Sequence, residues 1–172
     1  MLVLALVACN GNLVTIRVED SVSTVVPQGT VLEGLVGELG FDGFLEMDVT
    51  SADELRNQGV EPGDITSATF EQFDLEVTAP EGGDLSFLES ITLSVEAPDL
   101  ANARFAHSEE FPEGASRVFL TLDELNLQPY VVSQNMTITT DVTGTRPDED
   151  TTVRAHFVLA VGVTTAGAVG EL

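Results

Sequence analysis

The side chains that could carry out chemistry are one cysteine, two histidines and an unusual number of carboxylates. Cys9, the only cysteine, ends an uncharged apolar run that begins at Met1. His107 and His156 are the only histidines, and the sequence has no HxH or HxxxH spacing of the kind used for zinc. It also has no G-x-S-x-G nucleophile motif and no glycine-rich phosphate loop with its lysine. Cys9 therefore has the most specific sequence context of these residues.

The segment Leu6-Val7-Ala8-Cys9 resembles the lipobox of bacterial lipoproteins. The resemblance implies that residues 1–8 are a signal peptide and that Cys9 is the first residue of the mature protein, with a diacylglyceryl group on its sulfur. Residues 1–8 are too few to span a bilayer, which needs about 20 apolar residues, but they suit the apolar region of a secretory signal. No basic residue precedes them, so we expect a leader truncated at its start. The alternative is a buried N-terminal strand with a chance cysteine.

The lipobox also predicts where the protein is located. We expect residues 9–12 to form a lipidated tether and residues 13–172 to form a single domain. In the lipoprotein family an aspartate after the cysteine favours the inner membrane, whereas this chain has Asn10. The protein is therefore expected to be secreted and lipid-anchored at the bacterial cell envelope, with the outer membrane favoured where one is present.

The net charge restricts the partners. The chain has 29 acidic residues against six arginines and no lysine, which gives a formal net charge of −23. Nucleic acid is excluded as a partner because phosphate binding needs a basic surface. An anionic membrane would repel the domain as well, so the lipid is needed to hold it there. Hydrophobic residues make up 43% of the chain, which predicts a folded domain and not a disordered one.

Calcium is the ligand that the loop carboxylates suggest first. The weak candidates are Asp84, Asp148, Glu149 and Asp150, all in loop-like segments. Oxygen-rich loops can hold calcium, but the D-x-[DN]-x-[DN]-G pattern of a dedicated calcium loop is missing. Solvated surface acids are the alternative interpretation, so we expect no metal or other cofactor. A pair of carboxylates could also serve a hydrolase, but with 29 acids their abundance carries little information.

Alternation of apolar and polar residues with a period of two dominates the chain and predicts strands. The segment Ile65 to Ala79 changes its apolar phase, which predicts a β-bulge at Glu71-Gln72. On the last strand Arg154 and His156 share a face opposite the apolar residues, so His156 is expected on the solvent face or at an edge. The expected strands are 13–19, 22–26, 44–49, 65–79, 91–95, 103–106, 117–122, 135–142 and 152–163, with short helices over 51–58 and at 123–125.

The pattern predicts an all-β protein, an antiparallel β-sandwich of 8–9 strands with Ig-like architecture and one or two short helices. The mature part resembles Ig-like β-sandwich domains of envelope proteins. The expected function is a lipid-anchored binding or scaffolding module without enzyme activity, whose partner is an envelope protein or a glycan. The alternatives are a calcium-dependent adhesion or glycan-binding module and a carboxylate-dependent hydrolase.

Overall fold

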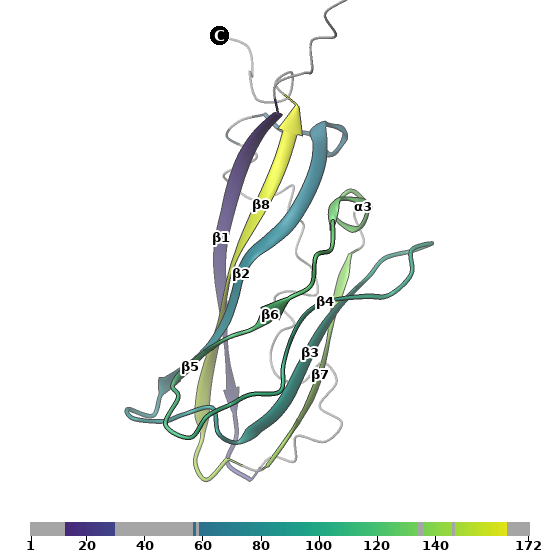
Figure 1. Ribbon diagram of the computed structural model, residues 1–172. Helices are drawn as coiled ribbons and strands as arrows, with labels where there is room; N and C mark the ends of the chain where they lie inside the picture. Colours follow the sequence, from purple (N-terminus) through teal and green to yellow (C-terminus); the bar gives the residue numbers. More distant parts are fainter. Residues whose placement is uncertain (1–12, 30–56, 58, 134–135, 146, 165–172) are drawn as a thin grey trace, which may run out of the picture.

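The described part of the chain folds into two four-stranded antiparallel sheets, as a computed structural model shows (Figure 1). The structure describes residues 13–29, 57, 59–133, 136–145 and 147–164. The first sheet has the order β1-β8-β2-β5, and the second has the order β6-β4-β3-β7. The predicted antiparallel β-sandwich is therefore confirmed. The strands are β1 (Leu13–Val26), β2 (Ile65–Ala79), β3 (Leu88–Glu96), β4 (Ala103–Ser108), β5 (Arg117–Phe119), β6 (Thr121–Leu122), β7 (Thr137–Gly144) and β8 (Thr151–Thr164).

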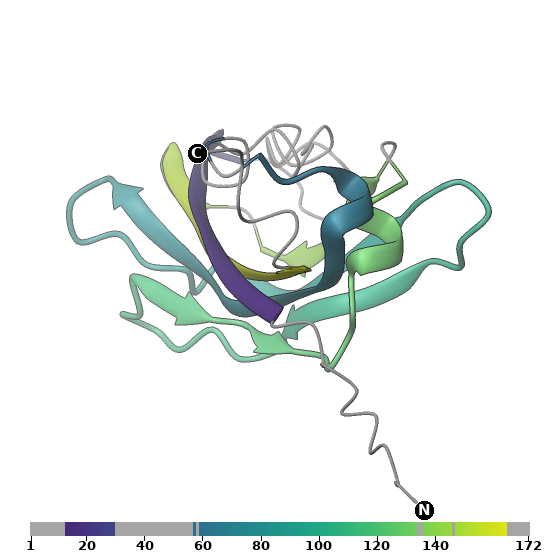
Figure 2. The same cartoon turned by 90° about the horizontal axis from the view of Figure 1, so that it is seen from above.

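The core fills the space between the two sheets because one face of each strand is apolar. On β8, alternate residues from Val153 to Val163 point inward and are buried. Four phenylalanine rings pack together at the centre, Phe70 and Phe73 from β2, Phe105 from β4 and Phe157 from β8. Figure 2 shows that the long strands β1 and β2 are curved.

The predicted bulge in β2 is confirmed. The register of β2 against β8 shifts between Phe70 and Gln72. The shift lets Phe73 and Leu75 enter the core, while Asp74 between them points to the outer face of the first sheet. The bulge thus determines which polar side chains of β2 lie on the outer face.

The structure corrects three predicted strands. Residues 13–19 and 22–26 form one continuous strand, β1, because the inward phase of Ile16, Val18 and Val26 is unbroken through Asp20 and needs no turn. The expected single strand 117–122 is instead divided between the sheets. Leu120 is buried and donates its N–H to the Phe73 carbonyl (2.9 Å), so β5 joins the first sheet and β6 the second.

The expected helical turn at 123–125 is also wrong. The turn forms a few residues later as α3 (Gln128–Val131), which has Pro129 in its first turn, a favoured position for proline. The Asn126 side chain accepts a hydrogen bond from the Gln128 N–H (3.1 Å) and supports the start of the helix. A second short element, η2 (Pro62–Asp64), precedes β2. The expected strand 44–49 and all but one residue of the expected helix 51–58 lie outside the described residues.

Candidate binding groove

A groove opens where the chain passes from the second sheet to the first. β6 pairs with β4 at two positions, Ala106 with Leu122 and His107 with Thr121. On the N-terminal side of Leu120 the chain follows β2 instead, where Phe119 pairs with Asp74, so β5 and the end of β4 separate (Figure 1). The space between these two arms has a volume of about 510 Å³, which lies within the range of about 300–1,000 Å³ typical of ligand sites. It is lined by Arg104, His107, Ser108, Glu109, Glu110, Pro112, Ala115, Arg117, Val118, Phe119 and Thr121.

Phe119 is the main apolar side chain of this groove. It is 60% exposed, more than any other large hydrophobic residue that the structure describes. The guanidinium carbon of Arg117 lies 4.9 Å from the centre of its ring, within the distance of a cation–π contact. An aromatic ring fixed by an arginine at the edge of a sheet provides a rigid apolar surface in a polar groove.

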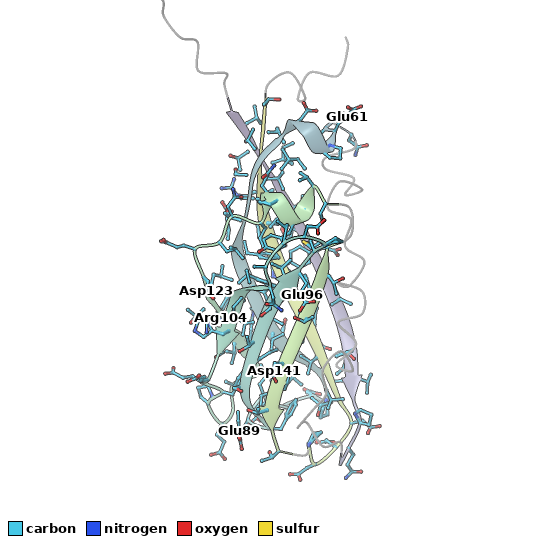
Figure 3. All side chains as sticks on the ribbon, turned by 90° about the vertical axis from the view of Figure 1, so that its right-hand side faces the viewer. Glu61, Glu89, Glu96, Arg104, Asp123 and Asp141 are labelled. Carbon is cyan, nitrogen blue, oxygen red and sulfur yellow. The ribbon has the colours of Figure 1, made fainter. Side chains whose placement is uncertain are left out.

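The opposite side of the groove contains Arg104 and His107. The Arg104 guanidinium binds Asp123 through Nε (2.7 Å) and Nη2 (3.3 Å), and Figure 3 shows the two side chains next to each other. This hydrogen bonding lowers the pKa of Asp123. The Nδ1 atom of His107 is buried and has no hydrogen-bond partner, since Asp123 Oδ1 is 3.9 Å away. A buried polar atom without a partner is costly, and here it belongs to a residue of the groove.

An ionic row on the outer face of the first sheet holds Arg117 in place. Arg117 Nε binds Asp74 Oδ2 (2.7 Å), Asp74 Oδ1 contacts His156 Nδ1 (3.1 Å), and His156 Nε2 contacts Glu19 Oε1 (3.0 Å). These four residues come from β5, β2, β8 and β1, so the row crosses every strand of the sheet. Gln72 adds a hydrogen bond from Nε2 to Asp74 Oδ1 (2.7 Å). We call Arg117, Asp74, His156 and Glu19 the ionic row.

Burial and charge act against each other at Asp74. The side chain is fully buried, with 0% exposure. Burial alone would raise the pKa of Asp74, but hydrogen bonds from Arg117, His156 and Gln72 hold it below its usual value. The pKa of His156 is raised by its hydrogen bonds to Asp74 and Glu19, which outweigh partial burial. The predicted outward face of His156 is confirmed, and the structure adds its partners on two other strands, Asp74 on β2 and Glu19 on β1.

The calcium candidates do not line this groove. Asp84, Asp148 and Glu149 line a second hollow, of about 280 Å³, whereas Asp150 accepts a hydrogen bond from the Gln28 N–H (2.8 Å). Asp84 already accepts hydrogen bonds from the backbone and hydroxyl of Ser86 and from the Gly114 N–H. The hydrogen bonds from Ser86 and Gly114 lower the pKa of Asp84. In the part of the chain that the structure describes, no group of three or more His, Cys, Asp or Glu side chains is arranged to hold a metal.

Other predictions stay open. The lipobox and Cys9 lie outside the described residues. No helix within those residues is both long and apolar enough to cross a membrane. Both hollows contain carboxylates, so the carboxylate-dependent hydrolase stays a prediction. Comparison with models of known protein families and with curated proteins finds no match to this chain.

Proposed function

We propose that the protein is a lipid-anchored cell-envelope protein that acts as a binding module. The observation that carries the proposal is the position of the lipobox relative to the sandwich. Cys9 is separated from Leu13, the first residue of β1, by Asn10, Gly11 and Asn12 alone. A lipid on Cys9 would therefore attach the first sheet directly to a membrane surface. Two or more acyl chains would anchor the domain stably, whereas a single chain anchors only marginally.

The strand register supports a binding role for the groove in this orientation. β1 has 14 residues, which corresponds to about 45 Å at about 3.3 Å per residue. Arg117 of the groove pairs with Glu76 of β2. Glu76 pairs with Arg154 of β8, which in turn pairs with Ser23 of β1, so Arg117 and Ser23 lie at the same height in the sheet. Ser23 is about ten residues beyond Leu13, or about 30 Å along the strand. The groove would thus lie well away from the lipid and be open to a partner.

The surface charge supports a lipid as the means of attachment. Exposed carboxylates such as Glu89, Glu96 and Asp141 lie along the second sheet (Figure 3). With a net charge of −23, the protein is repelled by anionic lipid headgroups. Attachment through Cys9 overcomes this repulsion, since each buried methylene of an acyl chain contributes about 0.8 kcal/mol.

The test of the anchor is membrane fractionation in the organism of origin, with the gene expressed from its own locus. The wild-type protein is expected in the membrane fraction after a high-salt wash and to be released only by detergent. The Cys9→Ala variant is expected to lose this behaviour, while Asn12→Ala, a change in the same tether, keeps it. Equal membrane retention of the Cys9→Ala and wild-type proteins would contradict the proposal.

A further inference from the structure

The groove carries no excess of positive charge. The two guanidiniums in its lining are each paired with a carboxylate, Arg104 with Asp123 and Arg117 with Asp74, and Glu109 and Glu110 also line the groove. An anionic ligand would therefore find no free positive charge there and would be repelled by the net charge of −23. The lining disfavours an anionic ligand.

The groove also offers hydrogen-bond donors and acceptors in fixed positions. Asp74 orients the Arg117 guanidinium through Nε, and Asp123 orients that of Arg104 through Nε and Nη2. His107, whose side chain is 27% exposed, adds an imidazole to the lining, and Thr121 adds a hydroxyl. Guanidinium and imidazole groups donate, carboxylates accept, and hydroxyls do both. Such a mixed set suits a ligand whose hydroxyl groups each donate and accept.

Phe119 adds an apolar surface to this polar lining. Its ring is 60% exposed and is fixed by the Arg117 guanidinium 4.9 Å from its centre. A sugar ring has one or two faces of C–H groups and a rim of hydroxyls, so it can pack on an aromatic ring while its rim makes hydrogen bonds. Burial of apolar area on the ring adds to the binding free energy.

We propose that the groove between the end of β4 and β5 binds a neutral oligosaccharide, with Phe119 as the stacking surface and Arg104, His107 and Glu110 as hydrogen-bonding groups. The inference rests on the proposed function as a binding module, but it does not depend on the lipid at Cys9. It also differs from calcium-dependent glycan binding, because the groove lies apart from Asp84, Asp148 and Glu149.

The test uses the full chain in detergent on a microarray of oligosaccharides. Neutral gluco-, manno-, galacto- and chito-oligosaccharides are printed beside uronic-acid oligosaccharides and beside acidic and basic peptides. The strongest neutral oligosaccharide is then titrated by calorimetry against the wild-type protein, with calcium and with chelator. Binding to a neutral oligosaccharide is expected, with the same affinity in both buffers.

Two groove variants and one matched control locate the site. Phe119→Ala removes the exposed ring, and Glu110→Gln keeps the shape but removes an acceptor charge. Each is expected to weaken binding about tenfold or more, as for a residue at the centre of an interface. Val25→Ala removes another exposed apolar side chain, 55% exposed, from β1 at the opposite edge of the same sheet. It is expected to leave the affinity unchanged.

The outcomes separate this inference from the anchor. Binding only to uronic-acid oligosaccharides or only to peptides, no binding at millimolar concentration, or undiminished binding by Phe119→Ala and Glu110→Gln would each overturn the inference. Loss of binding with chelator would overturn it in favour of a calcium-dependent module. If the protein isolated from its own organism is soluble and unlipidated but still binds the neutral oligosaccharide, only the proposed lipid anchor is refuted.

Discussion

Replacement of Asp74 by asparagine tests whether the ionic row stabilises the first sheet. Asp74 is fully buried and accepts hydrogen bonds from Arg117 at 2.7 Å and from Gln72 at 2.7 Å, with His156 at 3.1 Å. Asparagine has nearly the same shape, but it has no charge and presents an NH₂ group in place of one carboxylate oxygen. At least one of the cationic partners must then lose its hydrogen bond.

The expected magnitude follows from the burial of the partners. Breaking a fully buried ion pair costs about 3–5 kcal/mol, and a hydrogen bond to a charged group contributes about 1.5–3 kcal/mol. Arg117 is 42% exposed, so water can solvate it after the change and screening reduces the loss. We therefore expect Asp74→Asn to lower the free energy of unfolding by about 2–3 kcal/mol. At about 2–4 °C per kcal/mol for a domain of this size, the Tm falls by about 4–12 °C.

The assay is urea unfolding at pH 7 followed by far-UV circular dichroism. Glu71→Gln is the matched control, because Glu71 lies on the same strand and accepts a hydrogen bond from Arg17 Nε at the same distance, 2.7 Å. That pair is exposed, with 64% exposure for Arg17 and 40% for Glu71. Its loss is therefore expected to change the midpoint far less. Equal effects of the two substitutions, or a neutral Asp74→Asn, would refute the argument from burial.

Three further predictions concern pH, the core and calcium. The hydrogen bonds of His156 to Asp74 and Glu19 raise its pKa. The contribution of His156 to stability is therefore complete below about pH 6.5 and is lost as the pH rises through the folded-state pKa. His156→Gln should flatten the fall in the free energy of unfolding above about pH 6.5, and an unchanged slope would contradict this. Phe157 is 1% exposed at the centre of the core. Phe157→Ala should lower the free energy of unfolding by about 3–5 kcal/mol, which urea unfolding would show as a lower midpoint. A loss below about 1 kcal/mol would mean that this core is not packed as described. Melting curves with calcium and with chelator should overlap, because Asp84 already accepts hydrogen bonds from Ser86 and Gly114; a shift of several degrees would show that calcium binds after all.

The elements that the sequence predicts best are those whose pattern lies within one strand. The slip of apolar phase in β2 predicts its bulge, and the alternation in β8 predicts the outward face of His156, because both depend only on neighbouring residues. The sequence pattern predicts separate strands over 13–19 and 22–26, but β1 is continuous, because an edge strand tolerates a polar residue such as Asp20 when the inward phase continues on both sides of it. In α3, Pro129 reads as a loop signal, although proline also favours the first turn of a helix.

The candidate groove depends on contacts that no local pattern contains. Val118, Leu120 and Leu122 keep one apolar phase, so nothing in the pattern shows that Leu120 is the point where the chain changes sheets. The partners of His156 in the ionic row come from other strands, and their positions are fixed only by the strand register. One signal was available: alternation puts Phe119 on the polar face with Arg117, and a large aromatic residue at a polar position is a candidate for binding.

The mass of the mature protein tests the account most directly. The protein is isolated from the membranes of its own organism, and its N-terminal peptide is analysed by mass spectrometry. We predict a chain that begins at Cys9 and carries a diacylglyceryl group on the sulfur. A chain with unmodified Cys9, still preceded by residues 1–8, would contradict it.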